Sequence, residues 1–173
     1  MGRLSENSVL NLKNKSHSVT AVIEVPKTGA EGVIIVQIYA KGGRLKYCYN
    51  FLGIQQFYAE SSSALPPGDH QVRMEFAYAG GGLGKGGTAS LFVDGKKVGE
   101  GKVGATAAMV FSADDGCDVG VDTGSPVSPD YGSRGNEFSG RVKGVQLAIA
   151  EDAVSVDHLV SPEEAVHIAM ARQ

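Results

Sequence analysis

The chain has few of the residues on which several protein classes depend. It has no tryptophan, only 7% aromatic residues, and two cysteines, Cys48 and Cys117, neither of which belongs to a C-x-x-C pair. Isolated cysteines of this kind are usually buried structural thiols, with a disulfide between them as the alternative. No apolar run approaches the roughly 18 residues that a membrane-spanning helix requires. We therefore expect no membrane span and no cysteine chemistry.

A dense basic surface is also missing. The formal net charge is -3, whereas binding to nucleic acid by counterion release needs clustered lysine and arginine. The first 15 residues contain no apolar run of signal-peptide length. We therefore expect a soluble, cytoplasmic protein that binds neither nucleic acid nor membrane.

Familiar catalytic patterns are absent as well. The sequence contains no G-x-S-x-G nucleophile elbow and no E-x-D-x-x-E run of the kind that sandwich glycosidases use for paired carboxylates. Its four histidines stand singly, none at the i, i+4 spacing of a metal-binding helix. The sequence thus predicts no catalytic residue.

One glycine-rich stretch has the glycine spacing of a phosphate-binding loop, but the segment after it does not have the pattern of a helix. Residues 82–87 read G-x-G-x-x-G with Lys85 inside, but a dinucleotide-binding loop must enter a helix. Here the next segment alternates Ala89, Leu91 and Val93 and then reaches Asp94-Gly95, a strong signal for a two-residue hairpin turn. We expect a connection between two strands, not a phosphate site.

The chain is rich in glycine and in short β patterns. Its 24 glycines are about twice the usual share, and they separate segments of period two such as "HSVTAVIEV" (17–25). The segment "GVIIVQIYA" (32–40) is apolar nearly throughout, as expected of one strand covered on both sides. "LKYCYNFLG" and "IQQFYAE" predict a hairpin at Gly53. Regularly spaced antiparallel strands predict a β-sandwich or jelly roll, formed as a single domain by residues 1–173.

The last third holds three further elements. A short strand is expected at 109–111, and a final strand over 138–149 requires a bulge at Gly144 to keep its apolar residues on one face. "SPEEAVHIAMARQ" (161–173) begins with Ser161 as N-cap, Pro162 at the first helical position and Glu164 completing a capping box. A short C-terminal helix should follow.

Two groups of residues are candidates for ligand binding. Tyr47, Tyr49 and Phe57 belong to an aromatic-rich region suited to stacking on a sugar, although alternate aromatic residues could equally fill the core. Asp114, Asp118 and Asp122 lie in a glycine-rich acidic loop and could bind calcium, which takes several carboxylate oxygens. In the alternative, these aspartates bond to their own backbone in turns.

Segments along nearly the whole chain resemble the C-terminal extension of large bacterial arylsulfatases. They include "KYCYNFLG", "PPGDHQVRMEFAYAGGGLGKGG", "VDGKKVGEG", "MVFSADDGCDVGVDTGSPVSPDY" and "SGRVKGVQL". The strand, turn, strand element "SLFVDGKKVGEGKV" is similar to that of concanavalin-like and laminin-G-like jelly rolls. The resemblance implies a jelly-roll accessory domain of a sulfuric ester hydrolase family.

The resemblance implies a module without catalysis. The reactive residue of sulfatases lies in a C/S-x-P-x-R motif of a separate domain, and neither Cys48 nor Cys117 has that context. We expect a structural or ligand-binding module that needs no cofactor, calcium excepted. The alternative is a stand-alone lectin-like domain that binds a carbohydrate or a small ligand.

One region departs from the arylsulfatase pattern. Between Gln37 and Lys46 the chain is shorter, with only "IYAKGGRL" in place of a longer glycine-rich and aromatic segment. A lost strand would expose a sheet edge, and exposed edges pair with other chains. We therefore expect a homo-oligomer, most simply a dimer.

Overall fold

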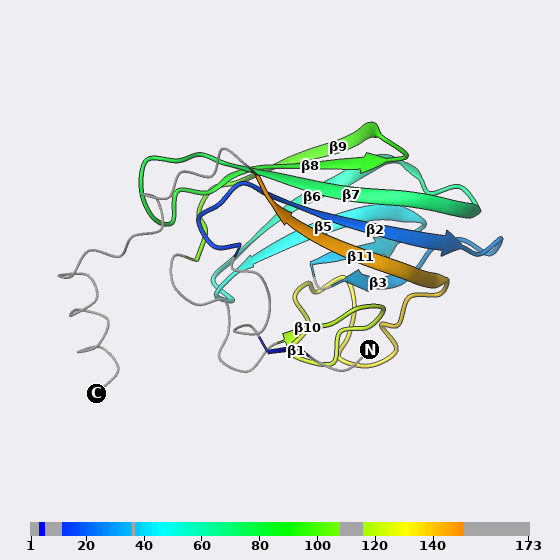
Figure 1. Cartoon of the computed structure of the whole chain (residues 1–173). Helices are drawn as coiled ribbons and strands as arrows, with labels where there is room; N and C mark the ends of the chain where they lie inside the picture. The colour runs from blue at the N-terminus through cyan, green and yellow to red at the C-terminus, as the bar shows by residue number, and fades with distance from the viewer. Residues whose placement is uncertain (1–3, 6–11, 36, 108–115, 151–173) are drawn as a thin grey trace.

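The computed structural model describes residues 4–5, 12–35, 37–107 and 116–150 (Figure 1). These residues contain strands and turns, and no helix in them is long and apolar enough to cross a membrane. The C-terminal helix and the strand at 109–111 that the sequence predicts lie outside the described residues. The strands are β1 (Leu4–Ser5), β2 (His17–Val25), β3 (Gly32–Ile35), β4 (Ile38–Lys41), β5 (Arg44–Phe51), β6 (Gln55–Ala64), β7 (Gly68–Tyr78), β8 (Gly87–Val93), β9 (Lys96–Val103), β10 (Gly116–Cys117) and β11 (Arg141–Ile149).

The strands form two main sheets. One has five strands in the order β11-β2-β7-β8-β9, and the other has four in the order β3-β4-β5-β6, while β1 and β10 form a separate pair. Every pairing within the two main sheets is antiparallel. The predicted antiparallel β-sandwich is confirmed.

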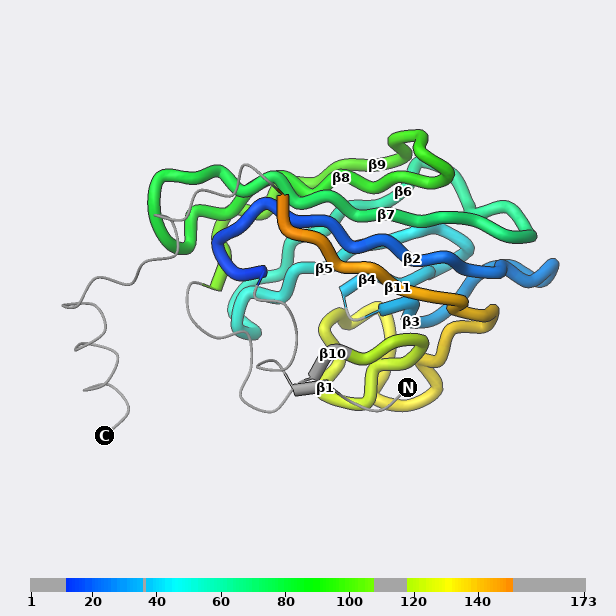
Figure 2. The backbone as a smooth tube through the Cα atoms, in the orientation of Figure 1, coloured from blue at the N-terminus to red at the C-terminus, as the bar shows by residue number. Residues whose placement is uncertain are grey.

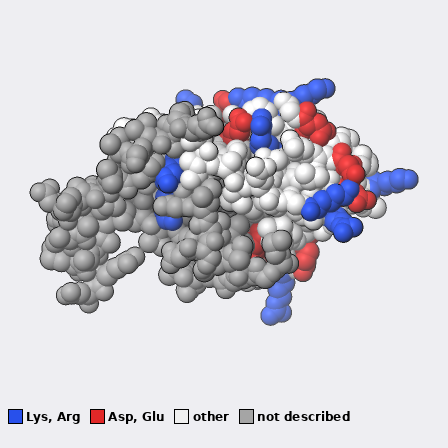
Figure 3. Space-filling view, in the orientation of Figure 1, with Lys and Arg blue, Asp and Glu red and all other residues white. Residues whose placement is uncertain are grey.

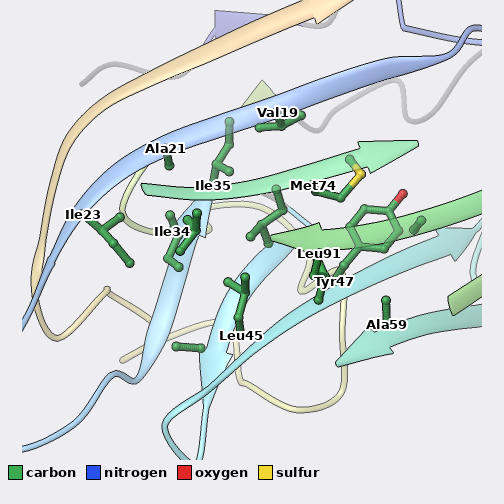
Figure 4. Packing of buried hydrophobic residues seen from close by; sticks show 14 of the residues in the cluster. Val19, Ala21, Ile23, Ile34, Ile35, Leu45, Tyr47, Ala59, Met74 and Leu91 are labelled. Carbon is green, nitrogen blue, oxygen red and sulfur yellow. The ribbon is translucent and has the colours of Figure 1, made fainter. Parts of the chain in front are cut away.

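The core lies between the two sheets and follows from period-two alternation. In β2, Val19, Ala21 and Ile23 point inward, and they lie opposite Met74, Val72 and His70 of β7. The four-stranded sheet contributes Ile34, Leu45 and Tyr47, which meet Met74 and Leu91 of the other sheet in Figure 4. Because each strand has one apolar face, the two sheets bury these faces against each other.

Two glycines allow the sheets to touch along one side. A Cβ atom built on Gly99 of β9 would lie 2.2 Å from the carbonyl oxygen of Glu60 in β6, and one on Gly101 would lie 1.9 Å from that of Tyr58. No other residue permits so close an approach of two backbones. The edge of β9 therefore lies directly against the edge of β6, and the sandwich is closed there.

The hairpins follow the turn signals in the sequence. Asp94 and Gly95 join β8 to β9 with φ of 49° and 78°, the left-handed pair that a type I′ turn requires. The Asp94 carboxylate also bonds the Nδ1 atom of His70 at 2.7 Å and accepts from the amide of Gln71 at 2.9 Å. The turn is thus tied to β7.

The segment 32–40 differs from its prediction as one strand. It forms two strands, β3 and β4, which fold back on each other with Val33 opposite Tyr39 and Ile35 opposite Ile38. The reversal needs Gln37 in a left-handed conformation, with φ of 77°, and a run of apolar residues gave no signal for it. The segment is nonetheless covered on both sides, as its apolar sequence predicts, because Ile34 faces the core and Val33 lies under a loop.

The shortened segment does not form a sheet edge. Residues 38–46 make the β4–β5 hairpin, and β4 has β3 on one side and β5 on the other. The edge strand beside β4 is β3, whose amide at Val33 donates to the carbonyl of Asn136 at 2.8 Å. The open edge that we expected from the shortened segment is therefore not there.

Candidate functional site

The candidate site lies on the outer face of the four-stranded sheet. In β5, Leu45, Tyr47 and Tyr49 point into the core, so the intervening Lys46, Cys48 and Asn50 point away from it. Residues 118–139, here called the covering loop, fold under this face, as the yellow tube in Figure 2 shows. The sheet and the loop together build the candidate site.

The covering loop is fixed to the sheet by polar contacts around one stretch. The carbonyl of Val127 accepts from Asn50 Nδ2 at 3.1 Å and lies 3.5 Å from Cys48 Sγ. The hydroxyl of Tyr39 donates to Asp130 Oδ2 at 2.7 Å and lies 3.0 Å from Ser128 Oγ. These contacts place Asp130 at the rim of the loop, beside β5.

An apolar contact supports the same attachment. Val33, Tyr39 and Cys48 form a small buried cluster with Val127 and Tyr131. The rings of Tyr39 and Tyr131 meet edge to face, with centroids 5.2 Å apart, a favourable geometry for aromatic pairs. The loop is therefore packed on the sheet as well as bonded to it.

Lys46 is the cation of the site. Its Nζ atom lies 3.0 Å from Asp130 Oδ2 and 3.5 Å from Glu60 Oε2. Partial burial opposes the charged form of Lys46, but the hydrogen bond and charge of Asp130, with help from Glu60, outweigh it and raise its pKa. For Asp130, burial likewise opposes ionisation, and the bonds from Tyr39 and Lys46 reverse the effect and lower its pKa. The pair is ionised at neutral pH.

Beside this pair the sheet offers an exposed aromatic ring. Tyr58 of β6 lies opposite Cys48 of β5 and is 41% exposed, whereas the other aromatic rings of the described residues are buried or half-buried. Its hydroxyl donates to Gln56 Oε1 at 2.9 Å. We call Lys46, Gln56, Tyr58, Glu60 and Asp130 the β5–β6 shelf. It combines one ring face with charged and amide groups that donate and accept hydrogen bonds.

Burial makes the other reactive groups near the shelf poor nucleophiles. It is the main cause of the raised pKa of the Cys48 thiol and of the raised pKa of the Tyr39 hydroxyl. A thiolate or phenolate is the reactive form of these side chains, and neither is favoured here. Burial thus disfavours the nucleophilic form of both side chains.

The structure places the predicted aromatic residues mainly in the core. Tyr47 and Tyr49 are 1% and 4% exposed and point between the sheets, where the Tyr49 hydroxyl accepts from the amide of Ala107 at 2.7 Å. Phe57 is half-buried and packs against the same core. Neither tyrosine presents a ring face to solvent, so both fill the core, which was the alternative to stacking on a sugar.

The predicted calcium ligands have structural partners. Asp118 accepts from the amide and the hydroxyl of Thr123, at 2.9 and 2.5 Å. Asp122 accepts from the amides of Gly124 and Val127 and, at 3.0 Å, from the hydroxyl of Tyr131. Asp114 lies outside the described residues. Within the part of the chain that the structure describes, no three histidine, cysteine, aspartate or glutamate residues gather in a way that could hold a metal ion.

The glycine-rich connection is a β7–β8 loop, as predicted. The amide of Gly84 donates to Asn14 Oδ1 at 2.9 Å, and the amide of Lys85 donates to the hydroxyl of Tyr78 at 3.1 Å. These two amides are engaged within the fold, and the loop leads from one strand to the next. The G-x-G-x-x-G pattern therefore marks a hairpin.

A cleft lies near the C-terminal end of β6, away from the shelf. It is a cleft of about 200 Å³ between the end of β6 and the β8–β9 turn, and Leu65, Val93 and Lys96 contribute to its wall. It is mainly apolar and has one acidic group, Asp94, at its wall. It offers fewer polar groups than the β5–β6 shelf.

Sequence reasoning missed the shelf because its members come from three segments. Tyr58 and Asp130 are not among the residues that the sequence offers as candidates for ligand binding. Period-two alternation in "RLKYCYNF" could have placed Lys46 and Cys48 together on the outer face. The arrival of the covering loop on that face had no local signal.

Comparisons with known proteins add little. No protein-family model matches the chain, and no curated protein matches it. Among solved structures it is similar to a native heptameric SAP-like pentraxin from Limulus polyphemus, with 11% identity over 79% of this chain and 84% of the pentraxin chain and a TM-score of 0.31. A likeness this distant supports no conclusion about ligand or assembly.

Proposed function

We propose that the chain is a non-catalytic β-sandwich module that binds a hydroxyl-rich ligand, in the first place a saccharide, on the β5–β6 shelf. The observation that carries the proposal is Tyr58, an exposed ring beside an ionised Lys46–Asp130 pair. An aromatic ring contacts the apolar face of a sugar, and neighbouring charged and amide groups bond its hydroxyls. Among the described residues, Tyr58 is the one aromatic residue that is exposed.

The shelf is also held in place before any ligand arrives. Tyr39 and Lys46 hold Asp130, and Gln56 holds the hydroxyl of Tyr58. Groups that need no rearrangement on binding lose less conformational entropy, which favours affinity. A sheet face bordered by a packed loop is thus a suitable scaffold for recognition.

We further propose that the module is of the accessory kind found at the C-terminus of bacterial arylsulfatases. The quoted segments support this origin, and the absence of a C/S-x-P-x-R motif from the sequence supports a role without sulfate ester hydrolysis. The raised pKa values of Cys48 and Tyr39, both caused chiefly by burial, are also what a binding surface without a nucleophile would have.

Thermal unfolding with a panel of simple and sulfated sugars, with calcium and with EDTA tests the proposal. A ligand that binds only the folded state, at about 100 times its dissociation constant, adds about 2.7 kcal/mol to the free energy of unfolding. For a chain of this size that corresponds to a rise in Tm of about 5–11 °C. We expect a sugar in the panel to produce such a rise without calcium.

Two variants locate the binding surface. Tyr58→Ala removes the exposed ring and should abolish the rise. Ile54→Ala changes an apolar side chain in the β5–β6 turn that is 78% exposed, more than Tyr58, and should leave the rise intact. A rise that survives Tyr58→Ala would place the ligand elsewhere, and no rise with any sugar would leave the saccharide proposal without support.

A further inference from the structure

The sandwich has one sheet edge that no described segment covers. The edge of β9 lies against β6 at Gly99 and Gly101. Beside β3, the amide of Val33 donates to the carbonyl of Asn136 at 2.8 Å, and the amide of Ser139 in the covering loop donates to the carbonyl of Glu31 at 2.8 Å. In contrast, β11 pairs with β2 on one side and with no other strand of the described chain on the other. Such an edge offers free amides and carbonyls to a further strand.

The two halves of β11 differ in how well they could pair. Arg141 and Lys143 are exposed, and the register shifts between Val142 and Gly144. Lysine residues and bulges are the features by which edge strands avoid pairing. Residues 144–149 have neither, because they contain no charge and no proline and their register with β2 is continuous.

The surface around this uncharged half is suited to a close neighbour. On the outer face, Gly144, Gln146 and Ala148 lie beside Val22, Thr20 and Ser18 of β2, all small or uncharged. Figure 3 shows a largely uncharged surface in the middle of the described part, with charged residues around it above, to the right, below and beside the grey atoms. On the inner face, Val145 and Leu147 are only half-buried. A second strand would cover them.

We propose that β11 pairs antiparallel with β11 of a second copy of the chain, about a two-fold axis at Gln146. An isologous contact needs a self-complementary surface, and this register pairs residues 144–148, all uncharged, with the same residues of the second copy. Gly144 lies opposite Ala148 of the partner subunit, and Val145 lies opposite Leu147 of the partner subunit. Lys143 then lies opposite Ile149 of the partner subunit, not opposite a second lysine.

The register also keeps the two sandwiches on the same side. Residues opposite each other in an antiparallel pair share a face of the sheet, so a register centred on one residue joins inner face to inner face. The two five-stranded sheets become one continuous sheet, and both sets of inward residues stay in their own cores. A register shifted by one residue would place Gln146 beside the inward-facing leucine.

Sedimentation velocity over a range of protein concentrations tests the proposal. Gln146 is exposed, so Gln146→Lys should leave the fold intact. In the dimer it places two like charges directly opposite each other, and we expect the dissociation constant to rise by up to about fivefold. Gln146→Glu should weaken the dimer in the same way.

Mixing the two variants gives the sharpest result. A Gln146→Lys chain and a Gln146→Glu chain place opposite charges across the axis, so the mixture should form a heterodimer more tightly than either variant forms a homodimer. Gln71→Lys adds the same charge at an exposed position of β7, inside the sheet, and should leave the dimer unchanged. Among residues 144–148, the amides that point away from β2 should exchange slowly only at concentrations where the dimer forms.

Three results would overturn the proposal. They are a strict monomer at the highest concentration, a dimer that Gln146→Lys leaves unchanged, and slow exchange of the β11 edge in the monomer. The last would mean that another segment of the same chain covers the edge. None of these results depends on a sugar, so the test of the β5–β6 shelf stands apart.

Discussion

The contact between β9 and β6 makes a strong prediction about Gly101. A methyl group at this position would lie 1.9 Å from the carbonyl oxygen of Tyr58 and 2.8 Å from its carbonyl carbon. Ordinary contacts of a Cβ atom begin at about 3.4 Å, so the overlap is roughly 1.5 Å. The obstacle is backbone in the middle of a strand, which cannot rotate away as a side chain could. Relief requires β9 and β6 to separate and open the core beside Ala59 and Val103.

The cost of Gly101→Ala should therefore reach the upper part of the range for overpacked sites, about 3 kcal/mol. For a protein of this size that lowers Tm by about 6–12 °C. Equilibrium unfolding in urea, monitored by tyrosine fluorescence at low protein concentration, measures the change in free energy. The midpoint should fall clearly below that of the unsubstituted chain.

Gly144→Ala is the matched control. Gly144 is also a strand glycine, but its added Cβ would meet no atom within 4 Å and its φ needs no glycine. Alanine should stabilise this position by about 0.5–1 kcal/mol, since glycine loses more conformational freedom on folding. Equal midpoints for the two variants would show that β9 and β6 do not touch as described.

Two further predictions concern stability. Burial lowers the pKa of His17 below 6.5, although the bond of its Nδ1 atom to the Lys15 carbonyl opposes the shift. The unfolded chain therefore binds more protons than the folded chain, and the free energy of unfolding should fall as pH drops below about 6.5. In urea titrations at pH 5–7, His17→Gln should make this dependence on pH weaker. Asp122→Ala removes the acceptor of three hydrogen bonds in the covering loop. The free energy of unfolding should fall by about 2–3 kcal/mol, and proteolysis of residues 118–139 should become faster. An unchanged urea midpoint would contradict the structural role of this aspartate.

The strands and their faces could be predicted where the pattern was local. Alternation in β2 and β7, the Asp94-Gly95 turn and the bulge at Gly144 all follow from neighbouring residues, and the structure confirms each. The reversal at Gln37 could not be predicted, because nothing in an apolar run marks a left-handed glutamine. Helix formation after residue 160 stays a prediction, since that segment lies outside the described residues.

The candidate site was less predictable because it depends on long-range contacts. Lys46 and Asp130 are 84 positions apart, and only the fold of the covering loop brings them together. Counting aromatic residues drew attention to Tyr47 and Tyr49, whose alternate spacing with Lys46 and Cys48 already placed them on one face. Only the packing of the second sheet on this face shows that it is the inner one. Tyr58, on the other face, then remained as the accessible ring.

The most direct test of the proposed function is an NMR titration of the isotope-labelled chain with a sugar that raises its Tm. The account predicts shifts that saturate with ligand and centre on Lys46, Gln56, Tyr58 and Asp130, with none of comparable size at the cleft beside Leu65 and Lys96. Shifts centred on that cleft, or none at the β5–β6 shelf, would contradict it.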